Sequence, residues 1–147
     1  MKNSAKHLAR EFAVQGLYQW LLGAGKPAQI LKDLKDLEGY KEADAKFLKE
    51  AINGAIGGAE EFQAQLEPLA DRKWADVSPV ERAVLLLGAY ELMRCPGVPY
   101  RVAINEGIEL AKVFGGTDGH KYVNGILDKL AAQVRPEEVA AKRRTNA

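Results

Sequence analysis

Apolar side chains recur every three to four residues along most of this chain, which is the spacing of one buried face of an α-helix. No stretch alternates between apolar and polar positions as a half-buried strand would, and no hairpin turn separates two apolar runs. The pattern predicts helices over residues 5–22, 27–38, 45–69, 79–94, 102–114 and 118–130. We therefore expect an all-α fold, with about seven helices in a single compact domain.

Several helix starts carry local signals. Ser4 and Asp44 stand where a side-chain oxygen can accept the first free amide hydrogens, and Thr117 or Asp118 can do the same before the last predicted helix. Residues 78–81, Ser-Pro-Val-Glu, predict a capping box in which Glu81 reaches back to the start of the helix. The run that follows, residues 83–90, is apolar on nearly all sides, which predicts a buried central helix.

Glycine and proline positions suggest where helices bend or stop. The apolar stripe of residues 48–69 keeps helical phase through Gly54, Gly57 and Gly58, which predicts one long helix bent near the glycine pair. Gly54 and Gly58 share a face, where a second helix could approach closely. Pro136 stops the last predicted helix, so we expect residues 1–135 to form the domain and residues 136–147 a polar, mobile tail.

Composition sets the class of protein. The 147 residues are 47% hydrophobic and 28% charged, enough for a core and a polar surface. A single cysteine, Cys95, excludes an internal disulfide and fits a reducing compartment. The first residues lack the apolar core of a secretory signal, and no run approaches the roughly 18 apolar residues of a membrane span. We expect a cytoplasmic protein that does not enter membranes.

Charge is distributed unevenly, although the net charge is only +1. Residues 1–20 carry a net +2, residues 21–67 a net −3 and residues 68–147 a net +2. Lys6, His7 and Arg10 fall within little more than one helical turn, a grouping that could hold phosphate groups. An ordinary solvated surface of mixed charge explains the same pattern, and the sequence leaves both open.

Residue types needed for catalysis are sparse. The two histidines, His7 and His120, are far apart in sequence, and Asp118 and His120 are two positions apart, so they do not share a helix face. Neither spacing fits a metal-ligand motif. We therefore predict that the protein is not an enzyme, and we expect no metal site and no cofactor.

Three segments together resemble the NusB family of bacterial transcription antitermination factors. They cover roughly half of the chain in the family's order, which a chance match of one motif would not do. The segments are residues 9–20 (AREFAVQGLYQW), 78–92 (SPVERAVLLLGAYEL) and 98–130, which begins VPYRVAINEGIELAKVFG. The resemblance implies two packed helical bundles, one N-terminal and one C-terminal.

The resemblance also implies a function. NusB proteins bind the boxA element of nascent RNA together with a small-subunit ribosomal protein, called NusE in this role, and so help RNA polymerase read through terminators in ribosomal RNA operons. Cationic side chains would hold phosphates, Tyr122 would stack on a base, and Asp118 and Asn124 would read base edges. The implied RNA-binding residues are Lys2, Lys6, His7, Arg10, Asp118, Lys121, Tyr122 and Asn124.

Two further residues match positions that the family uses for its protein partner. Glu81 would meet the basic surface of NusE, and Tyr18 would contribute to the same interface. Glu81 is equally suited to the capping box, so both roles stay open. The sequence Lys6-His7-Leu8 is less basic than the arginine run of many relatives, which predicts weaker RNA binding.

Two other functions remain compatible with the sequence. One is a helical interaction module that binds proteins through apolar helix faces without touching RNA. The other is a homodimer that covers its basic face until a partner arrives. Salt dependence separates RNA binding from apolar docking, because four or five cations on single-stranded RNA predict a log–log slope of about −3.

Overall fold

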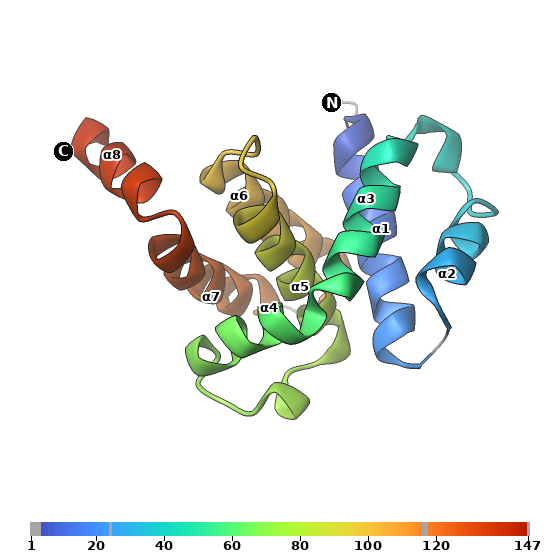
Figure 1. Ribbon diagram of the computed structural model, residues 1–147, viewed down its shortest axis with the longest axis horizontal. Helices are drawn as coiled ribbons and strands as arrows, with labels where there is room; N and C mark the ends of the chain where they lie inside the picture. The colour runs from blue at the N-terminus through green and yellow to red at the C-terminus, as the bar shows by residue number, and fades with distance from the viewer. Residues whose placement is uncertain (1–3, 24, 116–117, 147) are drawn as a thin grey trace.

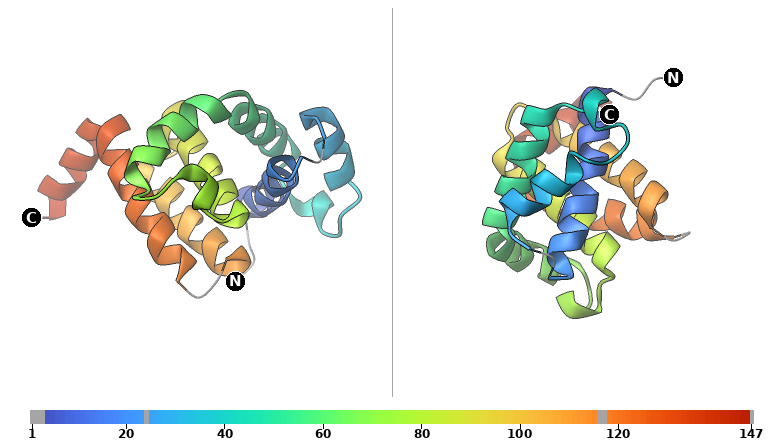
Figure 2. Two further views of the ribbon diagram at one scale, coloured as in Figure 1. Left: turned by 90° about the horizontal axis from the view of Figure 1, so that it is seen from below. Right: turned by 90° about the vertical axis from the view of Figure 1, so that its right-hand side faces the viewer.

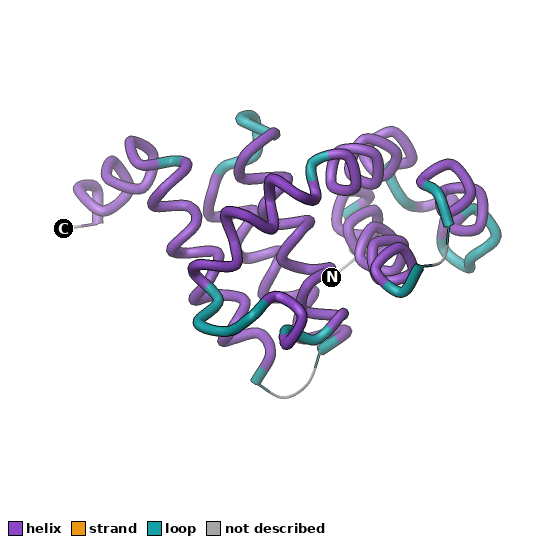
Figure 3. Tube along the Cα trace, turned by 60° about the horizontal axis from the view of Figure 1, so that its bottom comes forward, coloured by secondary structure: helices purple, strands orange, loops and turns teal. Residues whose placement is uncertain are grey.

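The computed structural model describes residues 4–23, 25–115 and 118–146, and every regular element in these ranges is helical (Figures 1 and 3). The all-α prediction is confirmed. The α-helices are α1 (Ala5–Leu21), α2 (Pro27–Leu34), α3 (Ala45–Gly57), α4 (Ala59–Leu66), α5 (Pro79–Arg94), α6 (Tyr100–Phe114), α7 (Gly119–Val134) and α8 (Pro136–Asn146). Short 3-10 helices are η1 (Tyr40–Glu42), η2 (Glu67–Leu69) and η3 (Trp74–Asp76). No helix in the described ranges has the length and apolar character that crossing a membrane requires.

The helices form two bundles that meet along α5. Helices α1, α2 and α3 pack against one another, while α4, α6 and α7 pack around α5. Helix α5 also contacts α1 and α3, so it belongs to both bundles (Figures 1 and 2). Residues 83–89 are all buried, which confirms the prediction of a central helix. Burial on all sides follows from its apolar sequence, since an exposed helix would show a polar face.

Capping side chains start the helices at three of the predicted positions. Ser4 Oγ accepts a hydrogen bond from the His7 amide at 3.0 Å, and Asp44 Oδ1 accepts one from the Phe47 amide at 3.0 Å. Ser78 Oγ likewise accepts from the amide of Glu81 at 3.2 Å.

The other two capping predictions, for Glu81 and for the start of α7, are not confirmed. The Glu81 carboxylate accepts from the Ser78 hydroxyl at 3.0 Å, rather than from the Ser78 amide as in the expected capping box. Before α7, the side chain of Asp118 makes no capping hydrogen bond to a described residue, and Thr117 lies outside the described residues.

The prediction of one helix over residues 45–69 is wrong. Helix α3 ends at Gly57, Gly58 takes a non-helical conformation, and α4 begins at Ala59. A side chain on Gly58 would lie 2.7 Å from the Phe62 ring, so only glycine lets Phe62 fold back into the core at the break. Gly54 does allow the close approach that its position predicted, because the ring of Tyr90 on α5 lies directly over it.

Residues 136–146 differ from the expected unstructured tail, because they form α8. Pro136 ends α7 but also fits the first turn of a new helix, where two glutamates favour the dipole. Figure 2 shows α8 projecting beyond α7. Its first turn is anchored: Val139 is buried, and Glu138 Oε1 accepts from the Tyr100 amide at 2.8 Å. Partial burial opposes the charged form of Glu138, but the Tyr100 amide and the Arg135 guanidinium together lower its pKa.

The Gly54–Tyr90 approach predicts a position-specific loss of stability. Gly54→Ala should lower the free energy of unfolding by about 1–3 kcal/mol, because the added methyl group overlaps the Tyr90 ring. Gly57→Ala, one turn later with nothing within 4 Å, is the matched control and should be neutral or stabilising. Urea denaturation followed by circular dichroism measures both. Equal effects at the two positions would contradict the close-approach role.

Candidate functional site

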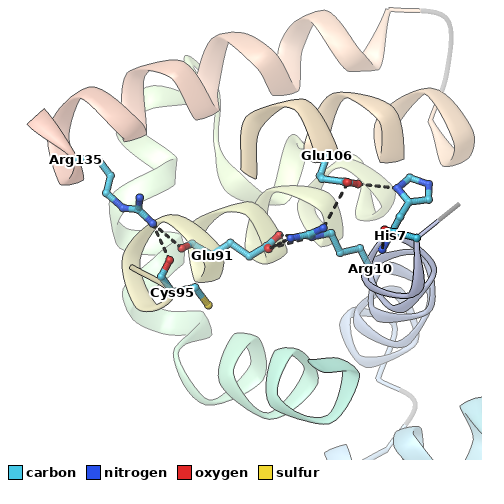
Figure 4. Close-up of polar contacts among 7 residues, drawn as sticks. His7, Arg10, Glu91, Cys95, Glu106 and Arg135 are labelled. Carbon is cyan, nitrogen blue, oxygen red and sulfur yellow. Dashed lines mark hydrogen bonds and ion pairs between the residues drawn. The ribbon is translucent and has the colours of Figure 1, made fainter. Parts of the chain in front are cut away.

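Arg10, expected to contact RNA, is instead part of a buried ion pair between α1 and α5. Its side chain and that of Glu91 are 5% and 1% exposed. Arg10 Nε donates to both Glu91 carboxylate oxygens at 3.0 and 3.1 Å, and Nη2 donates to Oε1 at 2.7 Å (Figure 4). Nη1 lies 3.4 Å from Glu106 of α6, and the guanidinium sits 5.0 Å from the centre of the Phe47 ring. The donors of Arg10 therefore point into the protein.

His7 belongs to the same network. Its Nδ1 lies 2.7 Å from Glu106 Oε2 and its Nε2 lies 3.2 Å from Glu11 Oε1. The side chain is 17% exposed, so both ring nitrogens are directed at carboxylates rather than at solvent (Figure 4). The predicted cluster of Lys6, His7 and Arg10 is thus not a group of outward-facing cations. An RNA contact by Arg10 would have to replace its hydrogen bonds to Glu91.

Electrostatics makes this network sensitive to the loss of a partner. Burial is the largest influence on Glu91 and raises the pKa of its carboxyl, while the hydrogen bonds and charge of Arg10 act in the opposite direction. A carboxylate removed from water without its guanidinium would have little compensation for the lost hydration. The pair therefore fixes α1 on α5 only as long as both members are present.

Lys6 is the member of the predicted cluster that faces solvent. It is exposed on the first turn of α1, with Nζ 6.0 Å from the centre of the Phe47 ring. Lys2, another predicted RNA-binding residue, lies outside the described residues. Lys6 is therefore the one described residue of the N-terminal set that can meet a phosphate without breaking an internal ion pair.

The first turns of α7 present a second group of predicted residues. Asp118 and Lys121 are 80% and 74% exposed, and Oδ1 of the aspartate lies 3.6 Å from Nζ of the lysine. Tyr122 is half-buried, and its hydroxyl donates to the Ala70 carbonyl at 2.8 Å. Burial raises the pKa of this hydroxyl, which keeps it a donor. The guanidinium of Arg72 lies 4.1 Å from the centre of the Tyr122 ring.

Arg72 is a residue that the sequence did not single out. It stacks on a predicted RNA-binding ring, and its side chain is 45% exposed. The ring and the guanidinium together make a planar cationic surface of the kind on which unpaired bases stack. Fifty positions separate the two residues, so no local pattern could have joined them.

Asn124 lies on a different side of α7 from Tyr122. Two helical positions correspond to a rotation of about 200°. Asn124 faces α6, in a groove of about 260 Å³. The groove is lined by Tyr100, Arg101, Ile104, Asn105, Ile108, Asn124 and Asp128. The predicted α7 residues are therefore not brought together on one surface.

Of the two predicted partner-binding residues, Tyr18 lines a groove that reaches the start of α5, and Glu81 lies in the first turn of α5. Tyr18 lines an apolar groove of about 340 Å³ together with Val80 and Phe114. Glu81 follows Val80 at the start of α5, and its carboxylate faces the first residue of α7, Gly119. The structure thus joins the end of α1, the start of α5 and the end of α6 in one groove, with Glu81 next to Val80 in the sequence at the start of α5. Val80 and Phe114 were not predicted to belong to it.

The polar groups do not form a metal centre in the described part of the chain. No three histidine, cysteine, aspartate or glutamate side chains are grouped there as a metal ion would require. The candidate surfaces are exposed cations, a stacked ring and grooves between helices, which are features of binding sites.

Comparison with known proteins identifies the family. The profile of the NusB family matches residues 7–132, which spans all the surfaces described above except Lys6 and Lys2. The chain belongs to the NusB family. The "Transcription antitermination protein NusB" of Ralstonia nicotianae is 53% identical over 140 residues, covering 95% of this chain and 90% of its relative. The proteins of the same name from Cupriavidus pinatubonensis and Thiobacillus denitrificans are 52% and 49% identical over 95% of this chain, covering 84% and 97% of their own lengths.

A solved NusB structure has the same architecture. The T. maritima NusB structure superimposes with a TM-score of 0.81 at 26% identity, covering 95% of this chain and 99% of that one. The two-bundle arrangement that the resemblance implied is therefore the architecture of this NusB chain.

Removing one member of the buried ion pair should lower stability strongly, and replacing both members should lower it much less. Arg10→Ala should lower the free energy of unfolding by about 3–5 kcal/mol, because Glu91 is left charged and unpaired in the interior. Replacing both members, as Arg10→Met with Glu91→Leu, should recover most of this loss. Lys6→Ala, an exposed lysine one turn earlier, is the control and should change stability by less than about 0.5 kcal/mol.

Chemical denaturation of the four proteins measures these values. A small effect of Arg10→Ala would show that the pair does not hold α1 on α5. A loss in the double variant as large as that in Arg10→Ala would show that the unpaired Glu91 is not the source of the loss, and would point to the contacts of the guanidinium with Glu106 and the Phe47 ring.

Proposed function

We propose that this protein is a non-catalytic, RNA-binding transcription antitermination factor of the cytoplasm. In this role it binds boxA-containing single-stranded RNA together with ribosomal protein NusE and promotes read-through of ribosomal RNA operons by RNA polymerase. The observation that carries the proposal is the family match over residues 7–132, with relatives about 50% identical that are named transcription antitermination proteins.

The geometry supports RNA contacts by a smaller set of residues than the sequence suggested. Lys6 and Lys121 are exposed and would hold phosphates. The ring of Tyr122, stacked with Arg72, would support an unpaired base. Asp118 would accept from a base edge once Lys121 turns to a phosphate.

The remaining predicted RNA contacts differ in their availability. Asn124 would reach a nucleotide only through its own groove beside α6. Lys2 precedes the described residues and stays in the proposal as a flanking cation. His7 would have to exchange a carboxylate for a phosphate, and Arg10 is not part of the proposed RNA surface.

NusE is the proposed occupant of the groove at Tyr18. An apolar centre formed by Tyr18, Val80 and Phe114, with the carboxylate of Glu81 at its edge, suits a basic protein with an apolar anchor. Because Glu81 also accepts from the Ser78 hydroxyl, binding of a basic partner would share this carboxylate between two donors.

One observation favours a second candidate function, a protein-interaction module without RNA contact. Two of the three side chains that the sequence grouped near the N-terminus, His7 and Arg10, face carboxylates inside the protein. Counting only its described cations, Lys6, Lys121 and Arg72, the RNA surface predicts a log–log salt slope of about −2, shallower than the −3 expected from the sequence. A homodimer that covers this surface remains a further proposal.

Fluorescence anisotropy of a short boxA-like RNA, with and without NusE, tests the RNA proposal. We expect binding that tightens with NusE and weakens with salt at the slope of about −2. Lys6→Ala with Lys121→Ala should reduce that slope by about 1.4, since each lost phosphate contact removes about 0.7. The control, Lys112→Ala with Lys129→Ala, removes two exposed lysines elsewhere on α6 and α7 and should leave the slope unchanged.

The alternatives give different results in the same titration. RNA that stays free while NusE binds would establish the interaction module. A steeper salt slope at lower protein concentration would indicate a dimer that covers the basic residues and dissociates on dilution. Equal reductions of the salt slope in the two double variants would show that RNA binds through the overall charge of the protein and not at Lys6 and Lys121.

The partner surface predicts a separable effect. Tyr18→Ala should weaken NusE binding by about tenfold or more, because aromatic side chains in apolar grooves act as interface anchors. RNA binding by the isolated protein should not change. Leu37→Ala is a matched control, since Leu37 is 38% exposed and Tyr18 37%. Calorimetric titration with NusE measures both; an unchanged affinity of the Tyr18 variant would exclude this groove as the NusE site.

A further inference from the structure

A basic groove lies between α2 and α3, on the N-terminal bundle and apart from the surfaces proposed for RNA and NusE. Its volume of about 760 Å³ is more than twice that of the Tyr18 groove. The lining residues, hereafter the lysine groove, are Ala28, Leu31, Lys32, Lys35, Tyr40, Ala45, Lys46 and Lys49. None of them belongs to a site predicted from the sequence.

The charge of the lysine groove has one sign. Lys32 and Lys35 stand on the α2 side, Lys46 and Lys49 on α3, and each pair is three positions apart on one helix flank. No carboxylate is among the lining residues, and none of the four ammonium groups forms an ion pair with another residue of the described ranges. This concentration is unexpected in residues 21–67, whose net charge is −3.

Two carboxylates close to the lysines in sequence have other partners, and none of the acidic residues of this segment lines the groove. Asp33 accepts from Gln29 along α2 at 2.8 Å, and Asp44 caps α3. The segment therefore separates its charges, with four lysines collected at the groove. Such separation maintains like-charge repulsion that a bound polyanion would relieve.

The floor of the groove is apolar and supported by the core. Leu31 and Tyr40 are half-buried, and Ala28 and Ala45 are small enough to leave the groove open. The Tyr40 ring packs on Phe12 of α1, with centroids 6.1 Å apart and the planes tilted by 60°. Because Phe12 is buried, the position of Tyr40 is set by the interior rather than by the surface.

We propose that the lysine groove docks an acidic amphipathic helix of a partner protein. Apolar side chains on one face of that helix would enter over Leu31 and Tyr40, and carboxylates on its flanks would meet the lysines of α2 and α3. Aliphatic lysine stems would add apolar contact at the rim. This is helix-in-groove recognition, with charge complementarity selecting an acidic partner.

The floor favours a peptide over a nucleic acid. Single strands are held by exposed rings on which bases stack, often with arginine alongside. The lysine groove holds no arginine, and its one ring is packed against Phe12. The proposal also does not depend on RNA binding, because the groove shares no residue with the RNA surface or the Tyr18 groove. Both could be occupied at once.

A synthetic peptide tests the proposal. The probe is a fluorescent helix of about 14 residues, four turns, with leucine at every third or fourth position and glutamate at most others. Anisotropy titration should show saturable binding to the full-length protein. A peptide of the same pattern with lysine for glutamate should not bind.

Variants locate the site. Lys32→Glu with Lys46→Glu should weaken peptide binding by about tenfold, equal to about 1.4 kcal/mol. The control, Lys112→Glu with Lys129→Glu, makes the same change of net charge outside the groove and should alter binding by less than about twofold. Ala45→Trp fills the groove without changing charge and should also abolish binding. Circular dichroism and thermal unfolding report whether each variant remains folded.

Several outcomes would overturn the proposal. The acidic peptide could fail to bind the unaltered protein. The charge reversals inside and outside the groove could also weaken peptide binding equally, which would indicate non-specific electrostatic attraction. Retained binding by Ala45→Trp would show that the apolar floor is not used. An oligouridine that competes with the peptide and depends on the same lysines would make the groove a nucleic-acid site. Dimerisation lost in the groove variants would make the occupant a second copy of this chain.

Discussion

The buried pairing of Arg10 with Glu91 is the interaction on which the arrangement of the two bundles depends. It joins the first helix to the central helix at 81 positions of sequence separation, with three hydrogen bonds from one guanidinium. Desolvation of both charges is tolerated because each satisfies the other, and because Glu106 and the Phe47 ring complete the surroundings of Arg10. Polar residues of α1 therefore contribute to its packing against α5, as Arg10 does, and not only to its solvent-exposed face.

Helix α5 transmits this constraint to the other end of the molecule. The guanidinium of Arg135 donates to the carbonyls of Glu91 and Cys95, where α5 ends (Figure 4). It also donates to the carbonyl of Leu92. The same guanidinium binds Glu138, which in turn holds the first amide of α6. One central helix therefore orders the end of α7, the start of α6 and the first turn of α8, because its last carbonyls would otherwise lack partners.

The proposed binding surfaces are what remains outside this internal network. The Tyr18 groove and the lysine groove each combine residues from two or three helices, and the stack of Arg72 on Tyr122 joins the segment between η2 and η3 to α7. The shapes of these surfaces therefore follow from the packing of the helices. Lys6 and Lys121 are exposed because no carboxylate competes for them in the interior. This division explains why a chain with a net charge of only +1 can still present local basic surfaces.

The sequence by itself determined the helical class, the buried central helix and the capping residues Ser4, Asp44 and Ser78, because periodicity and caps depend on neighbours within a few positions. Family resemblance added the two bundles. Tertiary structure alone decided that Arg10 points inward, that Arg72 lies on Tyr122, and that α3 and α4 separate at Gly58. It also decided that residues 136–146 continue as a helix. The inward position of Arg10, the stack of Arg72 on Tyr122 and the anchoring of α8 at Tyr100 each depend on a partner far along the chain. The break at Gly58 depends on how the nearby Phe62 ring packs into the core. The same arginine is a surface cation or a buried ion according to where a carboxylate comes to lie.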